Sequence, residues 1–341
     1  MELPRLKVAI LHYQPKLDDQ DVVVGQVADA LRSLQHDVAT VAVGDNVNEI
    51  LREIKKTRCD LVFNLCETFA EDYRMEVNVA ALMEMGRVRF TGSGTPGLLL
   101  AQDKILTKQL LEFHGVQTPN FASFENDTFE TRGTLRFPLI VKPARSDASI
   151  GIGRHSVVSN WQEMTERVRE IRDELQDVAL AEEFIEGREV YVAVVGPNAK
   201  PEVLPLIELN WGHAWDPAQP RVSDREVKFA EEKDGSPHLV IAEDLPKELR
   251  AQLEKMAILA YRALRLRDYA RLDFRISLTG EPYVLEANPN PYLDPKGELS
   301  LAAAKRGLTF PMLVERIITS AAERYGIVKR GVAGTANRRD L

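Results

Sequence analysis

Two strand-like runs near the C-terminus, joined by a short glycine-containing turn, constrain the fold of this chain more than any other feature. The runs cover residues 270–276 and 282–291, and Gly280 lies in the turn between them. Apolar and polar residues alternate along both runs, as in strands with one buried face, and a glycine favours a tight reversal. We therefore expect the two runs to pair as an antiparallel hairpin.

The predicted hairpin carries three side chains with oxygen ligands. Because side chains alternate between the faces of a strand, we expect Glu286 and Asn288 on one face, with Leu285 and Ala287 on the other. Asp273 joins the first two from the neighbouring strand. Carboxylate and amide oxygens suit Mg²⁺ bound beside substrate phosphates. The pattern thus predicts a magnesium–phosphate site, and the alternative is a half-exposed hairpin with solvated charges.

Composition excludes several classes of protein. The chain has 341 residues and a net charge of −8, with acidic and basic residues interspersed, which argues against a nucleic-acid or membrane partner. Two cysteines, Cys59 and Cys66, provide neither a disulfide framework nor a zinc site. The chain shows no signal-peptide pattern and no apolar run of the roughly 20 residues that span a membrane. We expect a cytoplasmic enzyme acting on small molecules.

The first hundred residues alternate short apolar strands with amphipathic helices, which predicts a parallel sheet with crossover helices. We expect this unit to be an N-terminal, Rossmann-like substrate domain at 1–100. Its strands are predicted at 8–11, 38–43, 60–64 and 87–91, and its helices at 22–34, 47–55 and 76–85.

Two α+β units are expected to follow, at residues 101–186 and 187–327, and the basic tail at 328–341 is predicted to be disordered. The predicted elements of the first are strands at 138–142, 153–157 and 179–184 and a helix at 161–176. Those of the second are a strand at 190–195, a polar loop at 210–235, a helix at 246–264, the hairpin and a helix at 310–325.

A glycine-rich motif at 92–97 matches G-x-G-x-x-G but lacks the acidic residue about 20 positions on that a dinucleotide site requires. We interpret it as a tight turn that leads into a helix beginning near Pro96.

Other segments are candidates for phosphate and nucleotide binding. Lys142 ends an apolar strand, and the loop of small residues at 144–153 follows it with backbone N–H groups that suit a phosphate chain. Lys104 is a second candidate, although a solvated helix lysine is the alternative for it. In the segment 180–190, Glu182 and Glu189 are able to accept from an adenine amine and from ribose hydroxyls. The alternative there is a linker with solvated acids.

The order of these motifs resembles the ATP-grasp superfamily, and most closely its D-alanine–D-alanine ligase branch, over about residues 90 to 325. This resemblance implies an α/β and α+β chain with the ATP-grasp fold. In that fold an N-terminal parallel-sheet domain precedes two α+β subdomains that clamp ATP. The family also favours a homodimer formed through the N-terminal domain.

The resemblance also implies roles for individual residues. Arg271 would steady the transferred phosphoryl group and the tetrahedral intermediate, and Lys228 would reach the γ-phosphate. Ser149 would be the third catalytic residue. Asp273, Glu286 and Asn288 would hold two Mg²⁺ ions, for which Mn²⁺ is a substitute. The residues expected around ATP are Lys104, Lys142 and Ser149 at the phosphates, Glu182, Glu183, Phe184 and Ile185 at adenine, and Glu189 at the ribose.

The chain departs from the family on the side of the acid and amine substrates. Residues 12–19 replace the family's Gly-Gly-x-Ser-x-Glu loop, Ala148 replaces a serine, and residues 288–292 differ from the usual Asn-Thr-x-Pro-Gly. These differences leave open whether D-alanine is used at all, and they fit a ligase acting on a different amino acid, peptide or small carboxylate better than an inactive enzyme. We expect Glu67 or Asp18 to contact the substrate, together with Tyr292, and solvated loop acids are the alternative for the first two.

The function predicted from the sequence is an ATP-dependent carboxylate–amine ligase that forms an acyl phosphate and releases ADP and phosphate. The substrate is expected to be an amino acid or a small peptide. A true D-alanine–D-alanine ligase, a non-catalytic ATP-binding regulatory module and a simple phosphotransferase stay open as alternatives.

Overall fold

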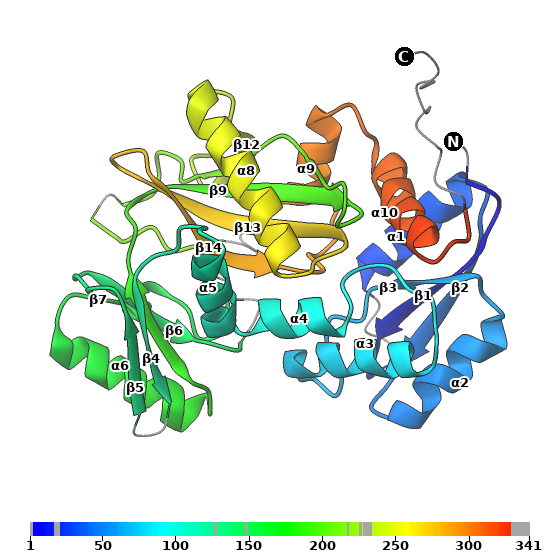
Figure 1. Ribbon diagram of the computed structural model, residues 1–341, viewed down its shortest axis with the longest axis horizontal. Helices are drawn as coiled ribbons and strands as arrows, with labels where there is room; N and C mark the ends of the chain where they lie inside the picture. Colours follow the sequence, from blue (N-terminus) through cyan, green and yellow to red (C-terminus); the bar gives the residue numbers. More distant parts are fainter. Residues whose placement is uncertain are drawn as a thin grey trace, which may run out of the picture.

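The fold is described from a computed structural model, which covers residues 3–16, 21–125, 128–146, 149–216, 218–224, 227 and 234–328. Within these residues the elements form three sheets with helices packed on them, as Figure 1 shows. The first sheet is parallel and the other two are largely antiparallel, so the predicted mixture of α/β and α+β architecture is confirmed. The predicted boundaries at residues 100 and 186 stay predictions.

The N-terminal sheet has the strand order β2-β1-β3. Helix α1 begins after Asp21, whose carboxylate accepts from the backbone N–H of Val23, and Asn46 caps α2 in the same way. The elements of this unit are β1 (Lys7–Tyr13), α1 (Val22–Ser33), β2 (Asp37–Val43), α2 (Val47–Thr57), β3 (Leu61–Asn64), the 3₁₀ turn η1 (Tyr73–Met75) and α3 (Glu76–Met85).

The strand predicted at 87–91 is wrong in extent. Phe90 makes a single parallel bridge to Val62 of β3. The pairing cannot extend because Arg87 and Gly92, on either side of it, both have positive φ values of 54° and 87°. The backbone turns at Gly92 and leads into α4 (Thr95–Gln102), with Pro96 in its first turn as the sequence indicates. Helix α5 (Lys104–Phe113) follows after Asp103, which caps it.

The central sheet has the order β5-β4-β8-β6-β7, with α6 packed against it. Its elements are β4 (Phe121–Glu125), β5 (Thr128–Arg132), β6 (Leu139–Pro143), the 3₁₀ turn η2 (Arg154–Ser156), β7 (Val157–Val158), α6 (Trp161–Glu174) and β8 (Ala179–Glu183). The strand predicted at 153–157 is wrong, because Ser156 Oγ accepts from the N–H of Gly153 and closes a 3₁₀ turn there. Strand β5 is exposed along its whole length, so it lacks the alternation that would have revealed it.

The C-terminal sheet has the order β12-β11-β9-β13-β14, with β10 paired to β9. The predicted hairpin is confirmed as β13 and β14, which pair antiparallel. The elements are β9 (Gly187–Gly196), β10 (Glu202–Val203), β11 (Ile207–Asn210), β12 (His238–Ile241), α8 (Lys247–Ala263), β13 (Asp268–Ser277), β14 (Pro282–Asn288), α9 (Glu298–Lys305) and α10 (Phe310–Arg324).

Two hydrophobic cores fix this sheet in place. One core joins it to the N-terminal unit through α1, α9 and α10, and the other packs α8 and α5 against its opposite face. In Figure 1, α10 lies beside α1, while α4 and α5 occupy the junction of the three sheets. The chain passes from the central sheet to the C-terminal sheet through the segment between β8 and β9. Several of the residues predicted to bind the nucleotide lie in this segment or directly beside it.

Candidate active site

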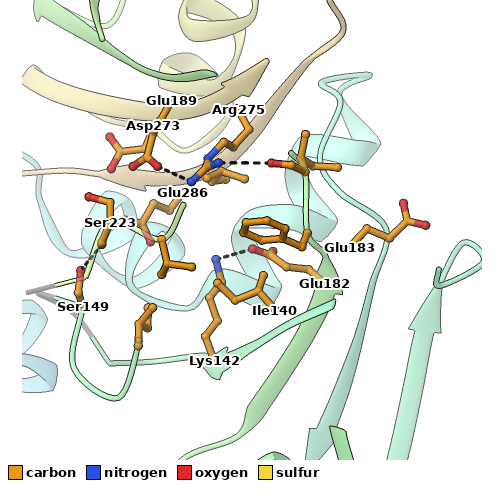
Figure 2. Close-up of a pocket in the computed structure, with 15 residues that line it drawn as sticks. Ile140, Lys142, Ser149, Glu182, Glu183, Glu189, Ser223, Asp273, Arg275 and Glu286 are labelled. Atoms are coloured by element: carbon orange, nitrogen blue, oxygen red, sulfur yellow. Dashed lines mark hydrogen bonds and ion pairs between the residues drawn. The ribbon is translucent and has the colours of Figure 1, made fainter. Parts of the chain in front are cut away.

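A cavity lies between the central and C-terminal sheets, and Figure 2 shows the side chains around it. Strands β6 and β8 form one side, and β9, β13 and β14 form the other. The loops at Ser149–Ile152 and Val222–Ser223 complete the lining. Its residues are Ile140, Lys142, Ser149, Ile152, Glu182, Glu183, Phe184, Ile185, Glu189, Val222, Ser223, Asp273, Arg275, Leu285 and Glu286.

The hairpin brings the three predicted metal ligands together at one end of this cavity. Asp273 lies opposite Glu286, and Arg271 lies opposite Asn288. The Asn288 amide donates to Asp273 Oδ2 over 3.2 Å, and Arg271 donates to both oxygens of the same carboxylate over 2.7 and 3.0 Å. Burial disfavours the charge of Arg271, but Asp273 and Glu298 outweigh it and raise the pKa of the guanidinium well above its ordinary value.

A β-bulge changes the expected alternation in β14. Asp273 pairs with Glu286 but the next residue of β13, Phe274, pairs with Val284, so Leu285 has no partner in the ladder. As a result Leu285 and Glu286 both line the cavity. The prediction that Leu285 faces away from Glu286 is therefore wrong, because strict two-residue alternation fails at a bulge.

The donor set fits a hard divalent cation. Two carboxylates and one amide oxygen lie on adjacent strands, and such ligands suit Mg²⁺ that retains part of its water shell. In the part of the chain that the structure describes, no group of three or more histidine, cysteine, aspartate or glutamate residues forms a metal cage. A site completed by substrate phosphates is the arrangement that this donor set allows.

A buried Lys–Glu–Lys cluster occupies the floor of the cavity. Glu182 on β8 lies 2.6 Å from Lys142 Nζ on β6 and 2.6 Å from Lys108 Nζ on α5, and all three side chains are at most 6% exposed. Burial alone would raise the pKa of Glu182, but the two lysines outweigh it and lower it. Burial lowers the pKa of Lys108, whereas for Lys142 the attraction of Glu182 and Glu286 prevails and raises it. The cluster is a fixed positive centre that faces the cavity through Lys142.

Glu189 is held by two side chains of the same sheet. Tyr191 Oη donates to Glu189 Oε1 over 2.8 Å, and Arg275 Nη2 donates to Oε2 over 2.7 Å. Burial, reinforced by Glu189, raises the pKa of Tyr191 well above its ordinary value, so its hydroxyl stays protonated and remains a donor. The orientation of the Glu189 carboxylate is thus fixed from both ends.

The segment between β8 and β9 crosses from one sheet to the other. The backbone N–H of Phe184 donates to Pro138 O and that of Glu183 to Asn120 O, each over 3.0 Å. The Glu183 side chain accepts from the Asn120 amide over 3.1 Å. Ile185, Phe184 and Ile140 give this end of the cavity an apolar lining.

Lys104 and Ser149 both lie near the part of the hairpin that carries Glu286. Lys104 is the first residue of α5, only 6% exposed, so it is not the solvated helix lysine that the sequence left open. Its Nζ donates to Ser146 O over 2.5 Å, and it borders a smaller hollow with Glu286 and Asn288. Ser149 adopts a positive φ of 57°, and its hydroxyl donates to Ser223 O over 3.3 Å. Lys228 lies outside the described residues.

Several known proteins are similar to this chain. The sequence model described as "D-ala D-ala ligase C-terminus" matches residues 109–319. A D-alanine–D-alanine ligase of Carboxydothermus hydrogenoformans is 33% identical over 86% of this chain and 90% of its own length. The chain belongs to the D-alanine–D-alanine ligase family. An uncharacterized protein, y4sG of Sinorhizobium fredii, is 35% identical over 78% of this chain and 75% of its own.

Solved structures of the D-alanine–D-alanine ligase family share the ATP-grasp fold. The ligase of Bacillus anthracis complexed with ATP has a TM-score of 0.71 at 20% identity, covering 94% of this chain and 99% of the other. The VanG D-Ala:D-Ser ligase of Enterococcus faecalis has a TM-score of 0.69 at 17% identity, covering 93% and 100%. As a family member, the chain is an ATP-dependent carboxylate–amine ligase that forms carbon–nitrogen bonds. No helix in the described residues is long and apolar enough to cross a membrane.

This ligase has a second hollow, of about 580 Å³. It lies between the N-terminal unit and the segment after β14, where Tyr292 Oη donates to Asp21 Oδ1 over 2.9 Å. Glu67, predicted as a substrate contact, is half-buried beside Thr68, which lines the hollow. Asp18 lies outside the described residues. The lining residues are Tyr13, Pro15, Asp21, Val22, Thr68, Glu71, Tyr73 and Tyr292.

Sequence reasoning missed two charged residues at the cavity between the sheets: Arg275, which lines it, and Lys108, which is buried against Glu182. Both carry a positional signal, since Lys108 is four residues after Lys104 on a helix and Arg275 two after Asp273 on a strand, so each shares a face with a predicted residue. Asp21, Tyr13 and Glu71 were missed around the second hollow, where loops bring distant residues together and no periodicity marks them.

Proposed function

We propose that this ligase activates a small carboxylic acid, amino acid or peptide as an acyl phosphate and couples it to an amine, using ATP and Mg²⁺ in the cavity between its two antiparallel sheets. The observation that carries the proposal is the hairpin register. It sets Asp273, Glu286 and Asn288 beside Arg271 at the end of a cavity that Lys142 enters from the opposite sheet.

The charges explain why these groups are needed. A carboxylate that attacks the γ-phosphate meets a second anion, so cations must offset the repulsion. Lys142 and Lys104 supply fixed positive charge for the phosphate chain, with Ser149 on the loop beside it. Mg²⁺, held by Asp273, Glu286 and Asn288, would add charge neutralisation when bound. The alternate cation Mn²⁺ suits the same oxygen ligands.

Adenine fits the apolar end of the cavity, against Phe184 and Ile185, with Glu183 beside it. Glu189 is placed to accept from ribose hydroxyls. Glu182 already compensates two lysines, so we assign it first to orienting Lys142 and second to accepting from the adenine amine. Arg271, near the same end as the metal ligands, is the donor for the oxyanion that forms when the amine adds. Lys228 keeps its proposed role at the γ-phosphate.

The acid and amine are expected on the side of the second hollow. A volume of about 580 Å³ is in the range of pockets that hold small ligands. Tyr292 borders this hollow and also a further hollow that Arg271 lines. We therefore propose that Tyr292 contacts the substrate next to the reaction centre. Glu67 and Asp18 stay candidates for the substrate ammonium. We also propose a homodimer through the N-terminal unit, in the cytoplasm.

A D-alanine–D-alanine ligase proper is the second candidate, and it is favoured by several D-alanine–D-alanine ligases that are about 30% identical to this chain. The altered residues 12–19 and 288–292 favour a different acid or amine.

The test is release of ADP and phosphate across a panel of D- and L-amino acids, dipeptides and small carboxylic acids. Asp273→Ala serves as the inactive control. Turnover that requires both an acid and an amine is the expected result, and the pair that works names the substrates. D-alanine as sole substrate would establish the second candidate. ATP binding without turnover on any pair would favour a regulatory module instead, and ADP without free phosphate a phosphotransferase.

A further inference from the structure

Arg275 stands out in the nucleotide cavity because it contacts three different walls. It lies on β13 directly opposite Glu189 of β9 and is 4% exposed. Its Nη2 donates to Glu189 Oε2 over 2.7 Å and also to the backbone oxygen of Arg221. Its Nη1 donates to Ile185 O over 3.5 Å, and its guanidinium lies 5.6 Å from the centre of the Phe184 ring. Figure 2 shows it between the sheets, beside Glu189.

We propose that Arg275 is a positioning residue for the sugar end of the nucleotide. It fixes the carboxylate of Glu189 that accepts from the ribose, and it fastens the loop at Arg221–Ser223 across the cavity. This inference rests on the proposed nucleotide site, and it assigns to Arg275 a role that none of the expected ATP or metal residues has.

The first part of the role follows from the geometry of Glu189. A carboxylate has about four acceptor positions, and two of them are taken by Tyr191 and Arg275. The remaining lone pairs of the carboxylate are then held in fixed directions, so the two ribose hydroxyls can donate to them without reorganisation of the Glu189 side chain. Without Arg275, Glu189 would be a buried carboxylate with one neutral donor, and it would rotate toward solvent.

The second part follows from how the loop is attached. Apart from those of Arg275, the hydrogen bonds that hold the loop to the cavity among the described residues are Ser149 Oγ to Ser223 O at 3.3 Å and Tyr191 Oη to Ser223 Oγ at 3.4 Å. The free volume in the cavity is about 80 Å³, well below the roughly 300 Å³ of small ligand pockets. A nucleotide needs more room than this, and among the described residues the loop at Arg221–Ser223 is held across the cavity by a few hydrogen bonds.

The experiment compares binding of Mg-ATP, Mg-2′-deoxy-ATP and Mg-3′-deoxy-ATP by calorimetry in the wild-type protein, Arg275→Met and Arg275→Lys. Arg188→Met is the matched control, because Arg188 lies on β9 and pairs with Glu208 and Asp244 outside the cavity. Tryptic cleavage after Arg221, which is exposed, reports on the loop.

We expect the wild type and Arg188→Met to prefer ATP over one of the deoxy analogues by roughly tenfold, the value of a hydrogen bond to a charged acceptor. Arg275→Met should reduce this ratio to below about threefold and speed cleavage after Arg221 severalfold. Arg275→Lys, which keeps the buried charge, should retain most of the discrimination. If Arg275→Met fails to fold, Arg275→Lys still tests the loop, because one amine cannot serve Glu189, Ile185 and Arg221 together.

An unchanged ribose preference with unchanged cleavage in folded Arg275→Met, or unchanged cleavage after Arg221 in Arg275→Lys, would overturn the inference while leaving the ligase assignment intact. Failure of the wild type to bind any of the three nucleotides would instead overturn the proposed nucleotide site, and the inference with it.

Discussion

The nucleotide cavity and the hollow near Tyr292 differ in how their polar groups are held. Around the cavity, Lys142 and Glu182 lie on neighbouring strands of the central sheet and Glu189 on a strand of the C-terminal sheet; all three are at most 6% exposed and form ion pairs with buried partners. At the other hollow, Tyr292 is 45% exposed and lies on a loop. Groups set on packed strands are costly to alter, whereas loop residues change at little cost to the fold. Residues around the hollow near Tyr292 can therefore change while the strands that line the cavity stay fixed.

The largest effect is expected from removing the charge of one proposed metal ligand in the cavity. Glu286→Gln should lower kcat by about a thousandfold and raise the Mg²⁺ concentration needed for half-maximal activity, because metal and carboxylate together offset the phosphate charge. Steady-state release of phosphate over a range of Mg²⁺ concentrations measures both. Glu281→Gln, at the exposed turn of the same hairpin, is the matched control. Near-normal turnover in Glu286→Gln would show that the hairpin does not hold the metal.

The buried cluster should control stability as well as binding. Glu182→Gln leaves Lys108 and Lys142 without their carboxylate, so we expect the free energy of unfolding to fall by about 3–5 kcal/mol. Lys108→Met should cost less, since Lys142 still pairs with Glu182. Urea unfolding measures the loss, with Glu183→Gln as control because that side chain is 18% exposed and its ion pair to Arg136 spans 3.9 Å. Equal losses in the two glutamine variants would contradict the assignment.

The wild type and Glu182→Gln also give a pH-dependent prediction. The pKa of Glu182 is lower in the folded state than its ordinary value of 4.5, so its contribution to stability is present above about pH 4.5 and is lost as the pH falls further. The difference in unfolding free energy between the wild type and Glu182→Gln should therefore be constant near neutral pH and shrink below pH 4.5. Urea unfolding at a series of pH values tests it. A difference that grows on acidification would mean that the lysines do not control this carboxyl.

The smallest effect is expected on the substrate side. Tyr292→Phe removes the hydroxyl that donates to Asp21 and should raise the KM for the acid or the amine by about two- to tenfold, with the Kd for ATP unchanged. Tyr283→Phe, whose hydroxyl donates to Glu281, provides a control in the adjoining strand. A change in ATP affinity but not in KM would place Tyr292 on the nucleotide side and erase the distinction between the two regions.

The sequence by itself determined the elements whose signal is local. The two-residue period and Gly280 identified the β13–β14 hairpin, and apolar runs identified β1, β2 and β3 with their crossover helices. The order of motifs identified the family, because each motif is a short segment with its own pattern. Strand β5 escaped because its exposed side chains do not alternate, and the bulge at Leu285 because it depends on how two strands pair.

Only the tertiary structure decided which partners the charged residues have. Lys108 and Glu182 are 74 residues apart, and Arg275 and Glu189 are 86 apart, yet each pair is in contact because sheet and helix packing brings them together. Local sequence records which face of an element a side chain takes. It does not record what that face meets, since contacts between distant elements are set by the packing of the whole core. The buried cluster and the role of Arg275 therefore emerged from the fold alone.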